Sequence, residues 1–273
     1  MPVAPKIPRR RLQSCNLNHE DREFVEGRTL SALCGECFCM SIPENIADLQ
    51  SKIAQATKRA GRSPSEVALM AVTKTHPPDR IREAYESGLR LFGENRVQEF
   101  STKAGTLADL VVAEWHMIGH LQTNKAAKAA ELFSAVDSVD SVKLAEKLDA
   151  AARALNKQLQ VLIEVNVGGE AAKTGVAPDA PELEDLLRAA PRLEALAFRG
   201  LMTVPPFTDD PEDARTYFRK LRTLRDQIAM RKLPAITMEI LSMGMSHDFA
   251  VAIEEGSTCI RIGTAIFGER EKP

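Results

Sequence analysis

Residues 67–78 read VALMAVTKTHPP, an apolar run that ends in a lysine and two prolines. A run of this length predicts a buried strand, and the prolines favour a turn after it. Seven more apolar segments occur along the chain, with helical segments between them. The eight predicted strands are 67–74, 89–94, 114–119, 132–139, 159–167, 195–204, 238–244 and 258–267. Strand and helix alternating eight times within about 250 residues predict an α/β protein with a single closed (β/α)8 barrel of the TIM type.

Start and stop signals place helices around this barrel. Ser41-x-x-Glu44 is a capping box, which predicts a leading amphipathic helix that ends near Gly61. Asp210-Pro211 predicts a second helix start, with the aspartate as N-cap and the proline in the first turn. Other predicted helices cover about 144–155, 182–190 and 248–255. An open doubly wound sheet is the alternative architecture, but the GxGxxG turn that would favour it does not follow the first strand.

The first 40 residues differ in pattern from the rest of the chain. They carry Arg9-Arg10-Arg11 and show no sustained periodicity, which favours a disordered extension, residues 1–40, ahead of a barrel domain at 41–270. An organellar targeting peptide would also be rich in arginine, but five acidic residues argue against it. A third interpretation is that Met40 is the true start of the protein.

Composition argues against several classes of partner. The 273 residues carry a formal net charge of -2, which gives no general attraction to nucleic acid or to an anionic membrane. No apolar stretch is long enough to span a bilayer and no secretory signal is present, so we expect a cytoplasmic protein. A zinc site at Cys34-x-x-Cys37-x-Cys39 would have to take its fourth ligand from Cys15 or His19, and we expect no metal.

Lys74 is the first candidate functional residue. It ends the first predicted strand, where its amine would point into a largely desolvated pocket at the ligand-binding end of the barrel. Burial lowers the pKa of an amine and favours the neutral, nucleophilic form that imine formation with an aldehyde requires. The alternative is a strand-end lysine whose amine extends into solvent and does no chemistry.

The loops after the seventh and eighth strands predict a phosphate site, as is common in barrels of this class. Gly263 would let backbone N–H groups approach an anion, and Thr264 would add a hydroxyl donor. Ser246 would cap the helix that starts at Asp248, whose N–H groups and dipole favour a phosphate. Each residue also has a structural explanation, helix capping for Ser246 and packing for Gly263, but their joint occurrence favours a functional one.

Polar residues in other strands point to the same mouth of the barrel. Arg261 alternates with Ile260 and Ile262, so it faces the opposite way and needs a carboxylate or a ring nitrogen as partner. A structural ion pair is the alternative for this arginine. Asn95 and His116 end the second and third strands, where each is either a ligand-binding group or a hydrogen-bonded structural one.

Lys74 thus faces the predicted phosphate site across the barrel mouth. A small ligand with an aldehyde at one end and a phosphate at the other would satisfy both. Pyridoxal 5'-phosphate has this form, and so does a sugar phosphate in a lysine-dependent aldolase. Lys173, in a glycine-rich loop after the fifth strand, is a second lysine that would reach such a ligand unless it is merely solvated. The residues by themselves do not choose between the two ligands.

Seven motifs, in order from about Ser41 to Arg270, resemble the YggS/PROSC family of pyridoxal phosphate-binding proteins. They are AVTKTHP (71–77), FGENRVQE (92–99), WHMIGHLQTNK (115–125), VNVGGEAAKTG (165–175), GLMTVPP (200–206), LSMGMSHDFAVAIEEGST (241–258) and IRIGTAIFG (260–268). The family resembles the barrel domain of bacterial alanine racemase but lacks that enzyme's second, β-rich domain. Residues 1–39 are foreign to the family pattern.

The resemblance implies pyridoxal 5'-phosphate as the cofactor and assigns roles to six residues. Lys74 would form the internal aldimine, Asn95 would lie beside the ring, and Arg261 would face the pyridine nitrogen. The phosphate would be held by Ser246, Gly263 and Thr264. A permanent cation beside the pyridine nitrogen keeps it unprotonated, which makes the ring a poorer sink for the electrons of a carbanion.

The family is regarded as one that carries and buffers pyridoxal phosphate, so the resemblance implies a role in vitamin B6 homeostasis, without efficient turnover and without catalytic residues. Pyridoxal phosphate-dependent apoenzymes are the candidate recipients, and family members are often monomeric. The first competing hypothesis is an amino-acid racemase, for which the family lacks the opposing acid-base group. The second is a sugar-phosphate aldolase that uses Lys74.

Overall fold

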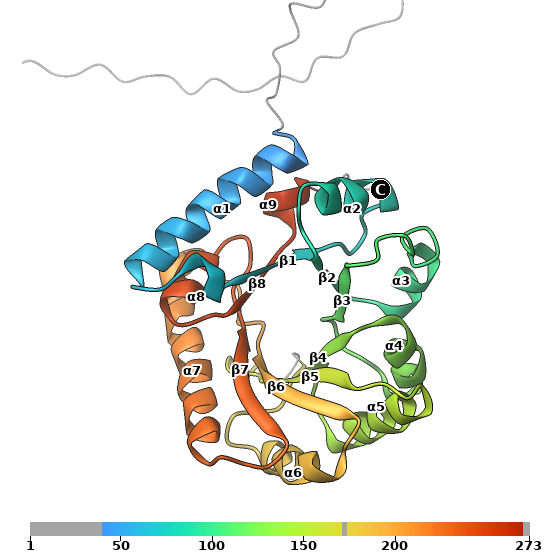
Figure 1. Cartoon of the computed structure of the whole chain (residues 1–273). Coiled ribbons are helices and arrows are strands. Elements are labelled where there is room, and N and C mark those ends of the chain that lie inside the picture. Colours follow the sequence, from blue (N-terminus) through green and yellow to red (C-terminus); the bar gives the residue numbers. More distant parts are fainter. Residues whose placement is uncertain (1–39, 171–173, 270–273) are drawn as a thin grey trace, which may run out of the picture. The chain divides into compact units, whose positions relative to one another are not determined.

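Eight parallel strands close into a barrel in the order β1 to β8, and Figure 1 shows them ringed by helices. The computed structural model describes residues 40–170 and 174–269, so the predicted extension, its cysteines and Lys173 lie outside the described residues. The strands are β1 (Ala68–Val72), β2 (Leu91–Glu94), β3 (Glu114–Met117), β4 (Ala135–Val139), β5 (Leu159–Glu164), β6 (Leu196–Met202), β7 (Ile236–Ser242) and β8 (Cys259–Ile262). Each pairs with the next, and β8 pairs with β1. The predicted (β/α)8 barrel is confirmed, and the open-sheet alternative is wrong.

Helices form the outer layer. They are α1 (Ile42–Arg59), α2 (Pro78–Glu86), α3 (Val97–Lys103), α4 (Ala126–Leu132), α5 (Val142–Ala154), α6 (Pro181–Ala189), α7 (Arg215–Met230), α8 (Phe249–Glu254) and α9 (Thr264–Phe267). Short 3-10 turns add η1 (Pro64–Glu66), η2 (Thr123–Lys125), η3 (Ala190–Arg192) and η4 (Pro211–Ala214). Ser41 and Glu44 form the complete capping box that was expected at the start of α1. Within the described part of the chain, no helix has the length and apolarity that a bilayer crossing requires.

Several predicted strand boundaries differ from the observed ones by up to three residues, and two differences are larger. The eighth apolar segment does not continue as a strand to residue 267, because β8 ends at Ile262 and the chain enters α9 directly after Gly263. A short apolar run cannot by itself distinguish a strand from a buried helical turn. Asp210 caps the 3-10 turn η4 rather than α7, whose own first residue is Arg215. Neither difference alters the order of the elements.

Side chains on the strands alternate between the barrel interior and the helix layer. Met70 of β1 lies in register with Arg261 of β8, and a Cβ at Gly93 of β2 would come within 2.8 Å of the Met70 sulfur. The next residue back from Gly93, Phe92, instead stacks on Trp115 in the helix layer, with 4.9 Å between ring centroids. Since direction alternates along a strand, Val72, two residues after Met70 and the last residue of β1, also faces inward.

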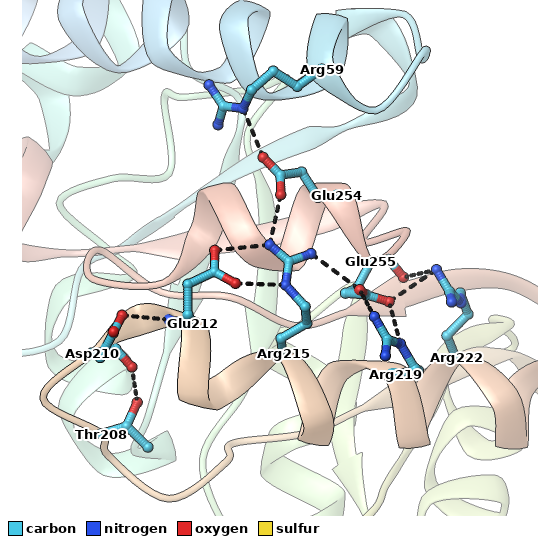
Figure 2. A network of polar contacts seen from close by, with 9 residues as sticks. All are labelled: Arg59, Thr208, Asp210, Glu212, Arg215, Arg219, Arg222, Glu254 and Glu255. Atoms are coloured by element: carbon cyan, nitrogen blue, oxygen red, sulfur yellow. Dashed lines mark hydrogen bonds and ion pairs between the residues drawn. The ribbon is translucent and has the colours of Figure 1, made fainter.

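Arginines and glutamates fix α8 against α7 and α1, as Figure 2 shows. The Glu255 side chain, 5% exposed, contacts three arginines of α7 at 3.1, 2.8 and 3.1 Å, namely Arg215, Arg219 and Arg222. Glu254 bridges Arg59 of α1 at 2.7 Å and Arg215 at 2.8 Å. Burial would raise the pKa of Glu255, but the arginines outweigh it and hold the pKa below its usual value. These ion pairs therefore fix the carboxyl end of α8, where the chain turns toward β8.

Candidate functional site

Lys74 lies in a tight turn directly after β1, at the carboxyl end of the barrel. The His76 N–H donates to the Thr73 carbonyl at 3.1 Å, which places Lys74 and Thr75 at the centre of the turn. Thr75 has a φ of +67°, as at the third position of a type II turn, where glycine is usual. The Thr73 hydroxyl donates to Glu94 Oε1 at 2.7 Å, and Lys74, the next residue, is half-buried.

The loops after β7 and β8 converge, as predicted. The hydroxyls of Ser246 and Thr264 are 3.5 Å apart, and the Ala265 N–H donates to Ser246 Oγ at 3.4 Å. The prediction that Ser246 caps α8 is wrong, because the N-cap is Asp248, whose Oδ1 accepts the Met245 N–H at 2.6 Å. Ser246 lies two residues before this cap, and its hydroxyl instead faces the loop after β8.

Lys74 and this loop are neighbours, since β1 pairs with β8; they do not face each other across the mouth as expected. Gly263 is the single residue between β8 and α9. A Cβ at Gly263 would lie 3.6 Å from Val72 Cβ, an ordinary contact, and its φ of -112° is open to any residue. Packing therefore does not require glycine at this position.

Arg261 faces into the barrel, as its alternation with isoleucines predicted. Its side chain is buried, with Nη1 donating to Ser242 Oγ and Nη2 to the Thr203 carbonyl, both at 2.7 Å. The alternative for this arginine, a structural ion pair, is not found among the described residues, where its hydrogen-bond partners are a hydroxyl and a carbonyl. Burial lowers the pKa of the guanidinium, and nearby carboxylates oppose the shift. The two hydrogen bonds fix the cation between β6, β7 and β8.

Asn95 follows β2 two residues after Gly93 and therefore shares its inward face. Its Oδ1 is buried and accepts no hydrogen bond within the described part of the chain. The backbone of Asn95 is held by Gly119, where a Cβ would come within 2.4 Å of the Asn95 carbonyl oxygen. A buried acceptor without a donor costs free energy unless a ligand supplies one, so this atom fits a site for a polar ligand.

Glu164 is a candidate that sequence reasoning missed. It ends β5 with 5% exposure, and its Oε1 accepts the Thr174 hydroxyl at 2.7 Å. Its Oε2 is buried without a partner among the residues described, and burial raises the pKa of this carboxyl. The signal was available, because a glutamate that closes the apolar run LQVLIE is as unusual as the lysine that closes the first run.

His116 lies deeper in the barrel than expected, away from the mouth. Its Nδ1 contacts the two carboxylate oxygens of Asp137 at 3.1 and 3.2 Å. Both residues line a cavity of about 450 Å³ whose wall includes the first residues of several strands, among them Ala68, Glu114 and Cys259. This cavity is at the amino-terminal end of the barrel, so the pair is separate from Lys74 and the phosphate loops.

We expect the contribution of the His116–Asp137 pair to stability to decrease as pH rises. Burial would lower the pKa of His116, but Asp137 and then Glu114 outweigh it, so the folded pKa is raised. A group of this kind stabilises fully below its unfolded pKa and loses that effect as pH rises through its folded pKa. The difference in free energy of unfolding between the wild-type protein and His116→Gln should be larger at about pH 6 than at about pH 9. Urea denaturation at both values checks this, and a difference that is constant or grows with pH would contradict it.

Comparisons with known proteins show the family of this chain. The family described as "Alanine racemase, N-terminal domain" matches residues 45–271. The pyridoxal phosphate homeostasis protein of Aquifex aeolicus is 46% identical over 232 residues, which cover 85% of this chain and 100% of that protein. The protein of the same name from Escherichia coli K12 is 40% identical and covers 84% of this chain and 97% of its own.

Solved structures give the same result. PipY of Synechococcus elongatus, determined with PLP bound, is 38% identical with a TM-score of 0.73, covering 84% of this chain and 100% of its own. An alanine racemase of Clostridium difficile has a TM-score of 0.62 at 13% identity over 84% of this chain and 58% of its own, a likeness of fold alone. The chain therefore belongs to the family of pyridoxal phosphate homeostasis proteins, whose barrel is that of the alanine racemase N-terminal domain.

Proposed function

We propose that this protein binds pyridoxal 5'-phosphate reversibly at the carboxyl end of the barrel and takes part in its homeostasis, without efficient turnover. One observation carries the proposal: β1 and β8 are paired, so the turn that holds Lys74 lies beside the loop where Ser246 and Thr264 meet. The names of the relatives and the PLP-bound structure of PipY support the same ligand.

The six predicted residues have distinct proposed roles. When bound, the ligand supplies an aldehyde that condenses with a primary amine to form an imine, with loss of water. The Lys74 amine is the proposed nucleophile, and Asn95 Oδ1 would accept a hydrogen bond beside the ring. The phosphate would lie against the backbone of Gly263 and receive hydrogen bonds from the hydroxyls of Ser246 and Thr264.

Arg261 supports binding rather than turnover. A guanidinium is always charged and has donors but no acceptor, so beside the ring nitrogen it would leave that atom unprotonated. The bonds to Ser242 and Thr203 hold it in one place. The protein with L-alanine and the cofactor in deuterated water should show no deuterium at the α-carbon beyond that of the cofactor alone. Incorporation well above that background would favour the racemase hypothesis.

A titration tests the proposed function directly. Purified protein with increasing pyridoxal 5'-phosphate should develop the visible absorbance of an imine and saturate at one equivalent. Borohydride reduction followed by peptide mapping should place the added mass on Lys74. Inorganic phosphate should compete, because it occupies the same loops. Failure of any imine absorbance to appear would contradict the proposal.

Reversible binding has a further consequence for partners. We propose pyridoxal phosphate-dependent apoenzymes as recipients, and we expect the barrel to act as a monomer. Loaded protein mixed with an apo-aminotransferase should restore its activity while the imine absorbance falls. Light scattering of the protein loaded with the cofactor measures its molar mass and so checks the expected monomer. A mass near that of two chains would contradict this expectation.

A further inference from the structure

The turn that presents Lys74 is conformationally costly. Thr75, its third residue, has a φ of +67°, which a β-branched side chain rarely adopts. Such a conformation persists when surrounding contacts impose it. Two charged side chains of α3, Glu99 and Lys103, hydrogen-bond to the turn on either side of Lys74.

Glu99 holds the strained side of the turn. Its Oε1 accepts the Thr75 N–H at 2.6 Å and the Lys103 ammonium at 2.5 Å. Partial burial alone would raise the pKa of Glu99, but Lys103 and the Thr75 N–H outweigh it and keep the pKa below its usual value. Glu99 is therefore a carboxylate that fixes the backbone immediately after Lys74.

Lys103 holds the other side. Its side chain is 10% exposed, and its Nζ donates to the Thr73 carbonyl at 3.2 Å and to Glu94 Oε1 at 3.3 Å. Glu94 also accepts the Thr73 hydroxyl at 2.7 Å. The residues on both sides of Lys74 are thus bound to the same ammonium, one directly and one through Glu99.

We propose that Glu99 and Lys103 are positioning residues that hold the Lys74 turn in its strained form and so aim the Lys74 amine at the incoming aldehyde. Neither side chain need touch the ligand, because both act through the backbone of residues 73 and 75. The inference rests on the proposed function. It adds a requirement beyond the presence of the six predicted residues, namely that the Lys74 amine is correctly positioned. A misplaced nucleophile reacts slowly even when its ligand is fully bound.

Glu99→Ala is the first test, because it leaves the buried Lys103–Glu94 pair in place. It should slow imine formation with pyridoxal 5'-phosphate by about tenfold or more in stopped-flow absorbance. Affinity for pyridoxine 5'-phosphate, which has no aldehyde, should stay within about twofold of wild type, because the phosphate loops are unchanged. The matched control is Glu131→Ala on α4, which also removes a glutamate paired with a lysine, Lys128 at 2.8 Å. It should change neither quantity.

A second variant separates positioning from general stability. Thr75→Gly lets the turn adopt its positive φ without strain, so it should reduce the slowing caused by Glu99→Ala to about threefold or less in the double variant. Hydrogen exchange of the residue 75 amide gives a readout that needs no ligand, and Glu99→Ala should accelerate it. If Glu99→Ala formed the imine at the wild-type rate, or if the double variant were as slow as Glu99→Ala, the positioning role would be overturned. Either result would leave the proposed function intact. A wild-type protein that forms no imine would overturn the proposed function and this proposal together.

Discussion

Lys74→Ala should eliminate the imine absorbance that the wild-type protein develops with pyridoxal 5'-phosphate. The amine is the atom that bonds to the aldehyde, so its removal abolishes the reaction instead of slowing it. Pyridoxine 5'-phosphate, which cannot form an imine, should still bind, since Ser246, Gly263 and Thr264 are unchanged. Absorbance titration and a competition assay on the same preparation measure both effects.

The control for this experiment is Lys52→Ala, which removes a lysine whose side chain is 58% exposed on α1. It should retain the full absorbance. An imine of equal intensity in Lys74→Ala would contradict the assignment and point to another lysine, with Lys173 the first to test by peptide mapping after reduction. Loss of pyridoxine 5'-phosphate binding as well would mean that the substitution had disturbed the phosphate loops or the fold.

Part of the candidate site was predictable because it follows from position along a strand. A lysine closing an apolar run, an arginine alternating with isoleucines, and glycine and threonine after the eighth strand each lie where the barrel places ligand-binding groups. These are local patterns, and the pairing of β1 with β8 puts the ends of the two strands, which Lys74 and Gly263 follow, side by side.

The rest of the site depends on contacts between distant segments. Ser246 was expected to cap α8, yet its hydroxyl meets Thr264 and Ala265, which lie 18 and 19 residues away. His116 was placed at the mouth, but β3 starts at Glu114 and leaves it inside the barrel beside Asp137. The periodicity of a sequence does not predict which residue of another strand a side chain will contact. These contacts are fixed by the register between strands that are far apart in sequence.

The fold was more predictable than its details. The alternation of apolar and helical segments predicted all eight strands, because the strands of a closed barrel are buried on both faces and are therefore mostly apolar. Irregularities within a strand leave a weaker signal. In FRGLMT, Gly200 interrupts β6, and a glycine within a strand typically marks a bulge or a close approach of backbone. The structure has both: the register of β6 shifts beside this residue on each of its two neighbours.

Of the substitutions that add one methyl group, Gly200→Ala should therefore lower the free energy of unfolding the most. A Cβ at residue 200 would lie 1.8 Å from the carbonyl oxygen of Ile240 on β7, and no rotamer change can relieve this because the backbone fixes the positions of both atoms. The strands must separate or slip, at a cost of about 4 kcal/mol or more in free energy of unfolding. The change also affects the site, since β6 leads to Thr203, whose carbonyl accepts a hydrogen bond from Arg261.

Gly105→Ala is the matched control, because a Cβ there meets nothing within 4 Å and the residue has no positive φ. It should change the free energy of unfolding by no more than about 0.5 kcal/mol. Urea denaturation followed by circular dichroism compares the two variants with wild type. Equal midpoints for Gly200→Ala and Gly105→Ala would show that β6 and β7 can separate at no cost. The close approach at Gly200 would then not be what sets the register that carries Thr203 to Arg261.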